Sequence, residues 1–176
     1  MSPNTAKMRL AELREEFDSS FSRPIRRHDV DHVELLAINA GGRAYALLLA
    51  QTSGVYPDRP VTPLPGPVPA LLGVAGFGGA IVPVYDLAAL LGHPVPDRPR
   101  WLVMAGGEPV LAFAFHGLDG HVRVPSDAVI AESGERRGGS LRGMVPLAGG
   151  TRPIVDLPAA RHAVRTLTAH FEERQT

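Results

Sequence analysis

The densest group of metal-ligating side chains in the sequence is His28-Asp29-Val30-Asp31-His32, where two imidazoles flank two carboxylates. If this segment were helical, the imidazoles would meet on one face and could ligate a cation such as zinc. The segment instead lies where a strand is expected to begin, and no third group of ligands is evident in the sequence. We therefore expect a solvated polar lead-in to the strand and no metal site.

A second candidate for chemistry is the glycine-rich segment over residues 73–79, which reads Gly-Val-Ala-Gly-Phe-Gly-Gly. Phosphate-binding glycine loops need a following helix whose N-terminus directs backbone N–H groups at the anion. Here a strand is predicted to follow. We expect these glycines to serve a tight turn or a close approach of another backbone.

Other nucleophiles and bases show no catalytic pattern. The sequence has no Gly-x-Ser-x-Gly motif, and Ser53, Ser126 and Ser140 have no evident histidine partner. The absence of cysteine excludes thiolate catalysis, iron–sulfur clusters and cysteine-ligated zinc. We therefore expect no catalytic residue and no cofactor, and histidines that lie singly at the surface or half-buried: His93, His116, His121, His162 and His170.

Two aspartates stand at the same place in a phrase that occurs twice. Residues 79–87 and 149–157 share Pro, Asp and Leu in step, seventy residues apart, with β-branched residues between them. A carboxylate pair is one interpretation. However, each aspartate follows a predicted strand and precedes a predicted helix, where it can accept from free backbone N–H groups. We therefore expect structural roles for four residues of the repeat: Pro83, Asp86, Pro153 and Asp156.

The elements that position these residues are mostly short strands with frequent turns, which favours closed β-barrels over a parallel sheet. A hairpin is predicted around Gly41-Gly42 and an equivalent turn at Gly106-Gly107. Six prolines over residues 57–69 predict a surface loop. Helices are expected over residues 87–91 and about 157–172.

The N-terminal residues 5–18 have an amphipathic pattern, with Leu10, Leu13 and Phe17 on one face. This predicts a helix that either packs on its own barrel or offers a groove to a partner.

Composition narrows the class of partner. The 18 basic and 18 acidic side chains balance, so the basic field that drives binding to nucleic acids is absent. The apolar runs are far shorter than the roughly 20 residues of a membrane helix, and the N-terminus lacks the apolar core of a signal peptide. We expect a soluble cytoplasmic protein that neither binds nucleic acid nor inserts into a membrane.

The order of several motifs resembles the CheW-like domain over about residues 31–160. Each motif is weak alone, but their order is specific. The motifs are Val61-Thr62-Pro63-Leu64-Pro65, Leu72-Gly73-Val74, residues 79–87, Ala112-Phe113-Ala114-Phe115-His116-Gly117, Leu141-Arg142-Gly143 and Pro153-Ile154-Val155-Asp156-Leu157.

This resemblance implies an all-β fold of two intimately packed five-stranded SH3-like barrels, to which the sequence pattern adds an N-terminal and a C-terminal helix. The domain would span residues 31–172 after a lead-in over 1–30, with barrel halves at roughly 31–95 and 100–157. The resemblance also implies a non-enzymatic adaptor in chemotaxis-like signal transduction. Its partners would be a chemoreceptor signalling tip and the regulatory domain of a CheA-type histidine kinase, in arrays at the membrane.

Two positions depart from the family pattern. The family usually reads Asn-Leu-Arg-Gly where this chain has Gly76-Phe77-Gly78-Gly79, and a common acidic residue appears here as Gly54. We hypothesise that the lost arginine and acidic residue normally pair, because losing one alone would leave an unpaired charge. Phe77, flanked by glycines, is expected to be an exposed anchor. Carried over by position, the candidate contact residues are Thr52, Val55, Leu72, Gly73, Val74, Phe77 and Gly78.

The departures leave alternatives open. One is an accessory adaptor that binds only one of the two partners. Another, from a different class, is a β-barrel that binds a small ligand, which polar residues converging on one cleft would favour.

Overall fold

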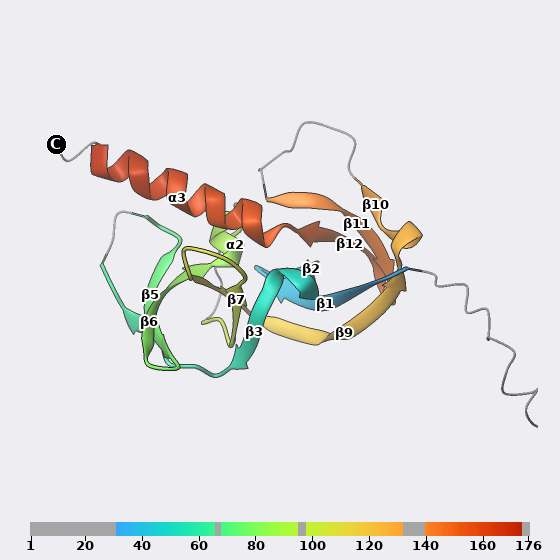
Figure 1. The fold of residues 1–176 in the computed structure, drawn as a ribbon, viewed down its shortest axis with the longest axis horizontal. Coiled ribbons are helices and arrows are strands. Elements are labelled where there is room, and N and C mark those ends of the chain that lie inside the picture. The colour runs from blue at the N-terminus through green and yellow to red at the C-terminus, as the bar shows by residue number, and fades with distance from the viewer. Residues whose placement is uncertain (1–30, 66–67, 95–97, 132–139, 174–176) are drawn as a thin grey trace, which may run out of the picture. The chain divides into compact units, whose positions relative to one another are not determined.

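The computed structural model describes residues 31–65, 68–94, 98–131 and 140–173. Within them, twelve strands form two sheets of six. The first sheet, in spatial order, contains β10 (Ile130–Ala131), β11 (Leu141–Leu147), β12 (Gly150–Val155), β2 (Arg43–Leu48), β1 (His32–Ala40) and β9 (Gly117–Pro125). The second contains β3 (Thr52–Pro57), β7 (Trp101–Ala105), β8 (Ala112–Phe115), β6 (Ala80–Asp86), β5 (Leu71–Phe77) and β4 (Thr62–Pro63). Figure 1 shows β5 and β6 toward the left and β10 to β12 toward the right.

The predicted all-β fold is confirmed. Each sheet has one strand more than the five expected, and the additional strands, β4 and β10, are two residues long and lie at sheet edges. Such short pairings leave no periodic signal in a sequence. β4 lies inside the proline-rich segment predicted as a surface loop, and Val68 of that segment is buried.

The two sheets are not built from consecutive halves of the chain. Strand β12 pairs in parallel with β2, and β6 pairs in parallel with β8. Each sheet therefore takes one hairpin, β1–β2 or β7–β8, from one half and its other four strands from the other half. The sequence predicted barrels spanning residues 31–95 and 100–157, and the observed exchange of hairpins differs from those bounds. Local sequence patterns could not predict it, because they do not encode pairing between distant strands.

The seventy-residue repeat produces the same backbone twice. The N–H of Asp86 donates to Ala70 O, and the N–H of Asp156 donates to Ser140 O, each at 2.7 Å. The antiparallel pairs β5–β6 and β11–β12 each contain one register shift, at equivalent positions. The repeated phrase is therefore a repeated strand ending.

Alternating residues fill three apolar clusters. Ala112 and Ala114 of β8 face the interior of their own sheet, whereas Phe113 and Phe115 join the central cluster shared with the other sheet and both helices. Strand β1 behaves alike, with Leu35 in its own sheet's interior and Leu36 in the central cluster. Because successive side chains point to opposite faces of a strand, these strands are buried on both faces, which packs the two sheets intimately.

One turn and one helix cap match their sequence signals. Gly41 and Gly42 join β1 to β2 with φ values of 58° and 74°, conformations that glycine adopts without strain. Asp86 caps α2 (Leu87–Leu90), since its Oδ1 accepts the N–H of Ala89 at 2.9 Å.

The C-terminal helix α3 (Leu157–Glu173) begins differently from the predicted repeat. The N–H of Leu157 donates to Oε1 of Gln51 at 3.1 Å, and Asp156 Oδ1 accepts from Gln51 Nε2 at 3.0 Å. Gln51, from the short 3₁₀ helix η1 (Leu49–Gln51), takes the capping role expected of Asp156. A second 3₁₀ helix, η2 (Ser126–Ala128), follows β9.

Among the residues described, no helix has the length and apolar character to cross a membrane. The helix predicted over residues 5–18 lies outside the described part of the chain, as do His28 to Val30 of the His-Asp segment. The side chains that are described contain no group of three or more His, Cys, Asp or Glu able to hold a metal ion.

Candidate partner-binding surface

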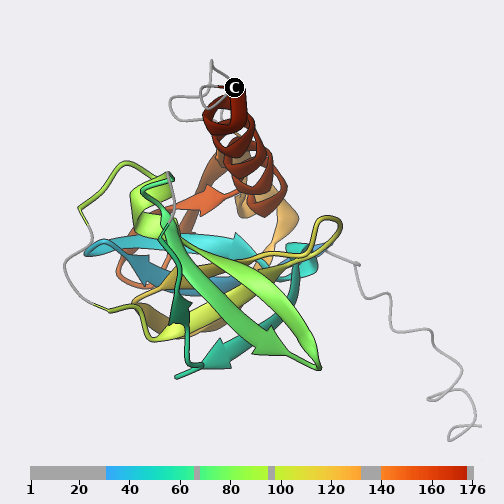
Figure 2. The ribbon, with the colours of Figure 1, turned by 90° about the vertical axis from the view of Figure 1, so that its left-hand side faces the viewer.

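The seven candidate contact residues all lie in the second sheet, on β3, on β5 and in the turn after β5. Three strands separate β3 from β5 in the ladder. Even so, the centre of the Tyr56 ring on β3 lies 4.9 Å from the centre of the Phe77 ring on β5, and the two rings meet edge to face. The sheet therefore curls until these strands approach each other, as expected of an SH3-like barrel. Figure 2 shows the green β5–β6 hairpin in front.

Phe77 is not the exposed anchor that the flanking glycines predicted. It is only 7% exposed and belongs to the interior cluster of the second sheet. The Tyr56 ring packs against its ring, and the guanidinium of Arg59 lies 5.0 Å from its centre. Residues distant in sequence therefore cover it, so its candidate role as a partner contact is replaced by a role in the core.

The two positions that depart from the family pattern have different surroundings. A Cβ on Gly54 would lie 2.7 Å from the hydroxyl oxygen of Tyr56, so this ring occupies the space of a side chain at position 54. A Cβ on Gly78 would meet nothing within 4 Å, although its φ of 54° favours glycine. The surface near Tyr56 is therefore aromatic where a charged residue is common in the family.

The other candidate residues are partly engaged by the fold. Thr52 Oγ1 donates to Leu49 O at 2.8 Å. Val55 packs against the central cluster and Leu72 against the interior of the second sheet, while Val74 is half-buried. Gly73 is buried, and a Cβ there would lie 2.0 Å from Thr62 O. These residues are therefore mostly packed within the fold, and their side chains do not project far from its surface.

The most exposed large apolar side chain of this hairpin was not singled out from the sequence. Ile81 on β6 is 78% exposed and pairs across the hairpin with Gly76, which has no side chain to cover it. The sequence does contain a signal for this exposure. Val82 and Val84 lie two residues apart and are buried, so Ile81, one residue before Val82, is on the opposite face of the strand. Tyr56 and Arg59 were also missed, since nothing local in the proline-rich segment marks an arginine that stacks on rings.

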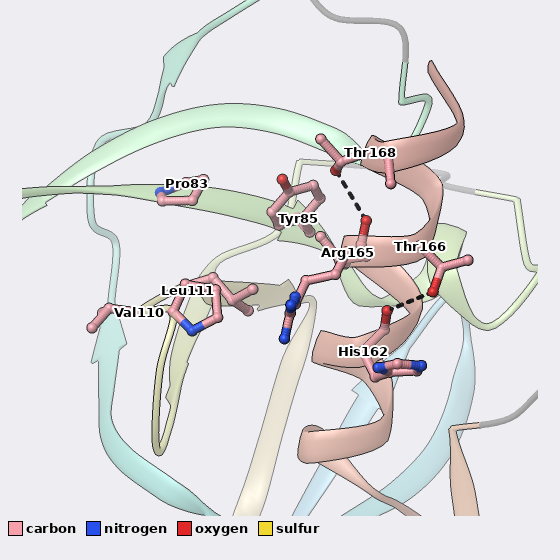
Figure 3. Close-up of a pocket in the computed structure, with 11 residues that line it drawn as sticks. Pro83, Tyr85, Val110, Leu111, His162, Arg165, Thr166 and Thr168 are labelled. Atoms are coloured by element: carbon pink, nitrogen blue, oxygen red, sulfur yellow. Dashed lines mark hydrogen bonds between the residues drawn. The ribbon is translucent and has the colours of Figure 1, made fainter. Parts of the chain in front are cut away.

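A groove of about 560 Å³ runs between α3 and the second sheet, with Tyr85, Leu111, His162 and Arg165 in its lining (Figure 3). Two hydroxyls on α3 are already engaged, because Thr166 donates to His162 O at 3.2 Å and Thr168 to Val164 O at 3.0 Å. No carboxylate is among the lining residues whose side chains the structure describes. Those described residues therefore offer no carboxylate–imidazole pair for acid–base chemistry.

One partly buried contact joins two titratable groups. Tyr45 on β2 lies with its hydroxyl oxygen 2.5 Å from Nε2 of His93. Burial raises the pKa of the Tyr45 phenol, and the positive charge of Arg43 opposes this rise with a smaller effect. The neutral phenol is therefore the form that the folded chain holds near neutral pH.

The comparisons with known proteins agree with this fold. The model of a family described as CheW-like domain matches residues 34–164. Among solved structures, the scaffolding protein TtCheW from Thermoanaerobacter tengcongensis is similar, with a TM-score of 0.63 and 12% sequence identity over 70% of this chain and 88% of that one. A comparison with curated proteins found no match. Since the family model covers well over half of the chain and reaches into both sheets, this chain belongs to the CheW-like domain family.

Proposed function

We propose that this protein is a non-enzymatic adaptor that couples chemoreceptors to a CheA-type histidine kinase in chemotaxis-like signalling. The observation that carries the proposal is the match of the CheW-like model from residue 34 to residue 164, which takes in strands of both sheets. Two packed barrels would offer two surfaces, one for each partner. The adaptor would act in the cytoplasm, at receptor arrays.

The mechanism would be geometric and not chemical. The central cluster shared by both sheets holds them as one body, so partners bound to each would be held at a fixed relative position. Holding both at once raises the effective concentration of one partner for the other, and contacts of micromolar strength then suffice for a stable array.

Isothermal titration tests the proposal most simply. The full chain is titrated separately with the regulatory domain of a CheA-type kinase and with a receptor signalling-tip fragment. Micromolar binding to both is expected. Binding to neither, by protein with an intact thermal transition, would contradict the adaptor function.

A second candidate is an accessory adaptor that binds only one partner. Gly54 and Gly78 favour it, because Tyr56 occupies the side-chain space at position 54 and position 78 is bare. The variant Gly78→Arg restores the family residue where space is open, although the φ of 54° there strains any side chain. If the second candidate holds, the native chain binds one partner, and Gly78→Arg strengthens binding to the other. If the native chain binds both, the second candidate is excluded.

A further inference from the structure

A second cavity, of about 640 Å³, lies beside the candidate surface and has a different chemistry from the groove along α3. Three arginines line it, two from the segment before β7 and one from the segment after β3: Arg98, Arg100 and Arg59. Pro60, Val61 and Leu72 supply an apolar wall. Its size falls within the range of sites that enclose a small ligand or a few side chains of a partner.

Arg59 is held with its charge available. Its guanidinium lies 5.4 Å from the centre of the Tyr56 ring and 5.0 Å from that of Phe77. Stacking on aromatic faces fixes the plane of a guanidinium and leaves its N–H donors at the edge. No carboxylate pairs with Arg59 in the described part of the chain.

The other two arginines differ in how they are paired. Arg100 binds Asp58, with Nε 3.0 Å from Oδ1 and Nη2 3.2 Å from Oδ2, and its guanidinium lies 6.0 Å from the centre of the Trp101 ring. Arg98 is exposed and has no ion pair or hydrogen bond among the described residues. Asp58 is the one acidic residue among the lining residues that the structure describes, so three guanidiniums there share one described carboxylate.

This local excess of positive charge stands out because the whole chain has a formal net charge of zero. Oriented guanidiniums bind carboxylates through paired N–H donors, and such charge-assisted hydrogen bonds are the strong ones. The wall of Val61 and Leu72 would take an aliphatic side chain beside those carboxylates. The guanidiniums and the apolar wall together suit one kind of occupant, a segment that carries both carboxylates and aliphatic side chains.

We propose that this arginine pocket, defined by Arg59, Arg98 and Arg100, binds an acidic segment of a partner protein in which Asp or Glu residues stand next to aliphatic ones. Nucleic acid fits less well. Binding of single strands uses open aromatic faces for base stacking, whereas Arg59 already lies over the Tyr56 and Phe77 rings. The inference is independent of which partners the proposed adaptor joins.

The test titrates the full chain with a short end-capped peptide in which glutamates alternate with leucines, and with the matched peptide carrying glutamines. The single tryptophan, Trp101, lies beneath Arg100 and reports occupancy by its fluorescence. The glutamate peptide is expected to bind, with affinity that falls as salt is raised. Equal binding of the glutamine peptide, or no binding of either, would overturn the proposal.

Variants locate the binding. Arg98→Ala, which breaks no interaction among the described residues, is expected to weaken the glutamate peptide about tenfold. Arg123→Ala removes the same charge from an exposed position on β9 in the other sheet and is the matched control. Arg59→Lys keeps the charge but loses the planar donor edge, so it is also expected to weaken binding. Equal losses for Arg98→Ala and Arg123→Ala would overturn the pocket, as would tighter Arg98-dependent binding of oligothymidylate.

Discussion

Gln51 Oε1 accepts the backbone N–H of Leu157 at 3.1 Å, across 106 positions of the sequence. The same amide donates from Nε2 to the carboxylate of Asp156 at 3.0 Å. A side chain from the first half of the chain therefore starts the helix that ends the second half. Because the two sheets exchange strands between halves, this contact joins regions that must be in place together.

The Gln51 cap should contribute measurably to the stability of the fold. Gln51→Ala leaves the N–H of Leu157 without its acceptor, and we expect it to lower the free energy of unfolding by about 1–2 kcal/mol. Urea denaturation followed by circular dichroism measures the loss. Ser53→Ala, at an exposed neighbouring position, is the control and should be nearly neutral. An unchanged midpoint for Gln51→Ala would mean that the cap is not formed in solution.

The two repeated aspartates should respond unequally to the same change. Asp86→Ala removes the acceptor for Ala89 N–H and is expected to cost about 1 kcal/mol. Asp156→Ala keeps the hydrogen bond from the N–H of Leu157 to Gln51, so it should lower the free energy of unfolding by less. Asp86→Ser, which keeps a capping oxygen, should recover most of the loss. Equal costs at the two positions would contradict the different caps.

Phe77→Ala is expected to act on stability, since the ring is 7% exposed inside the second sheet. Truncating a buried phenylalanine typically costs about 3–5 kcal/mol. Ile81→Ala, in the same hairpin but 78% exposed, should change stability by less than about 0.5 kcal/mol. Thermal denaturation of both variants distinguishes a core role for Phe77 from an exposed one. A midpoint for Phe77→Ala equal to that of the native chain would restore the exposed-anchor hypothesis.

Two glycines of β5 form another matched pair. A Cβ at Gly73 would lie 2.0 Å from Thr62 O, where the backbone of β4 cannot withdraw without losing its pairing. Gly73→Ala should therefore cost more than about 2 kcal/mol. Gly76→Ala meets nothing within 4 Å and should be nearly neutral by chemical denaturation. Similar midpoints for the two variants would rule out the close approach.

The alkaline limb of stability should depend on Tyr45. Burial raises the pKa of this phenol above its usual 10.0, with Arg43 opposing. Above about pH 10 the unfolded chain loses the proton first, so the free energy of unfolding falls as pH rises through the folded pKa. Melting temperatures of the native chain and Tyr45→Phe between about pH 8 and 12 test this. The variant should fall less steeply, and parallel slopes would contradict the raised pKa.

Much of the fold could be predicted because it rests on local signals. Gly41-Gly42 marks a hairpin, the alternation Ala112-Phe113-Ala114-Phe115 predicts a strand, and Asp86 stands where a helix needs a cap. The repeat predicted two equivalent strand endings, and both are present.

The remainder depends on contacts between distant segments. Three features join residues that are distant in sequence, so local patterns do not predict them. They are the exchange of hairpins between the sheets, the Gln51 cap, and the packing of Tyr56 and Arg59 over Phe77. Glycines beside Phe77 predicted exposure because only local cover was considered. The same limit hid the arginine pocket, whose three cations come from two separated segments.

The proposed adaptor function requires one molecule of this protein to hold two partners at once. The most direct test first saturates the chain with the kinase regulatory domain, then titrates in the receptor signalling tip and measures the heat and mass of the complex. A ternary complex is expected, in which the receptor fragment binds without displacing the kinase domain. Displacement, or a receptor fragment that binds neither the free nor the loaded chain, would contradict it.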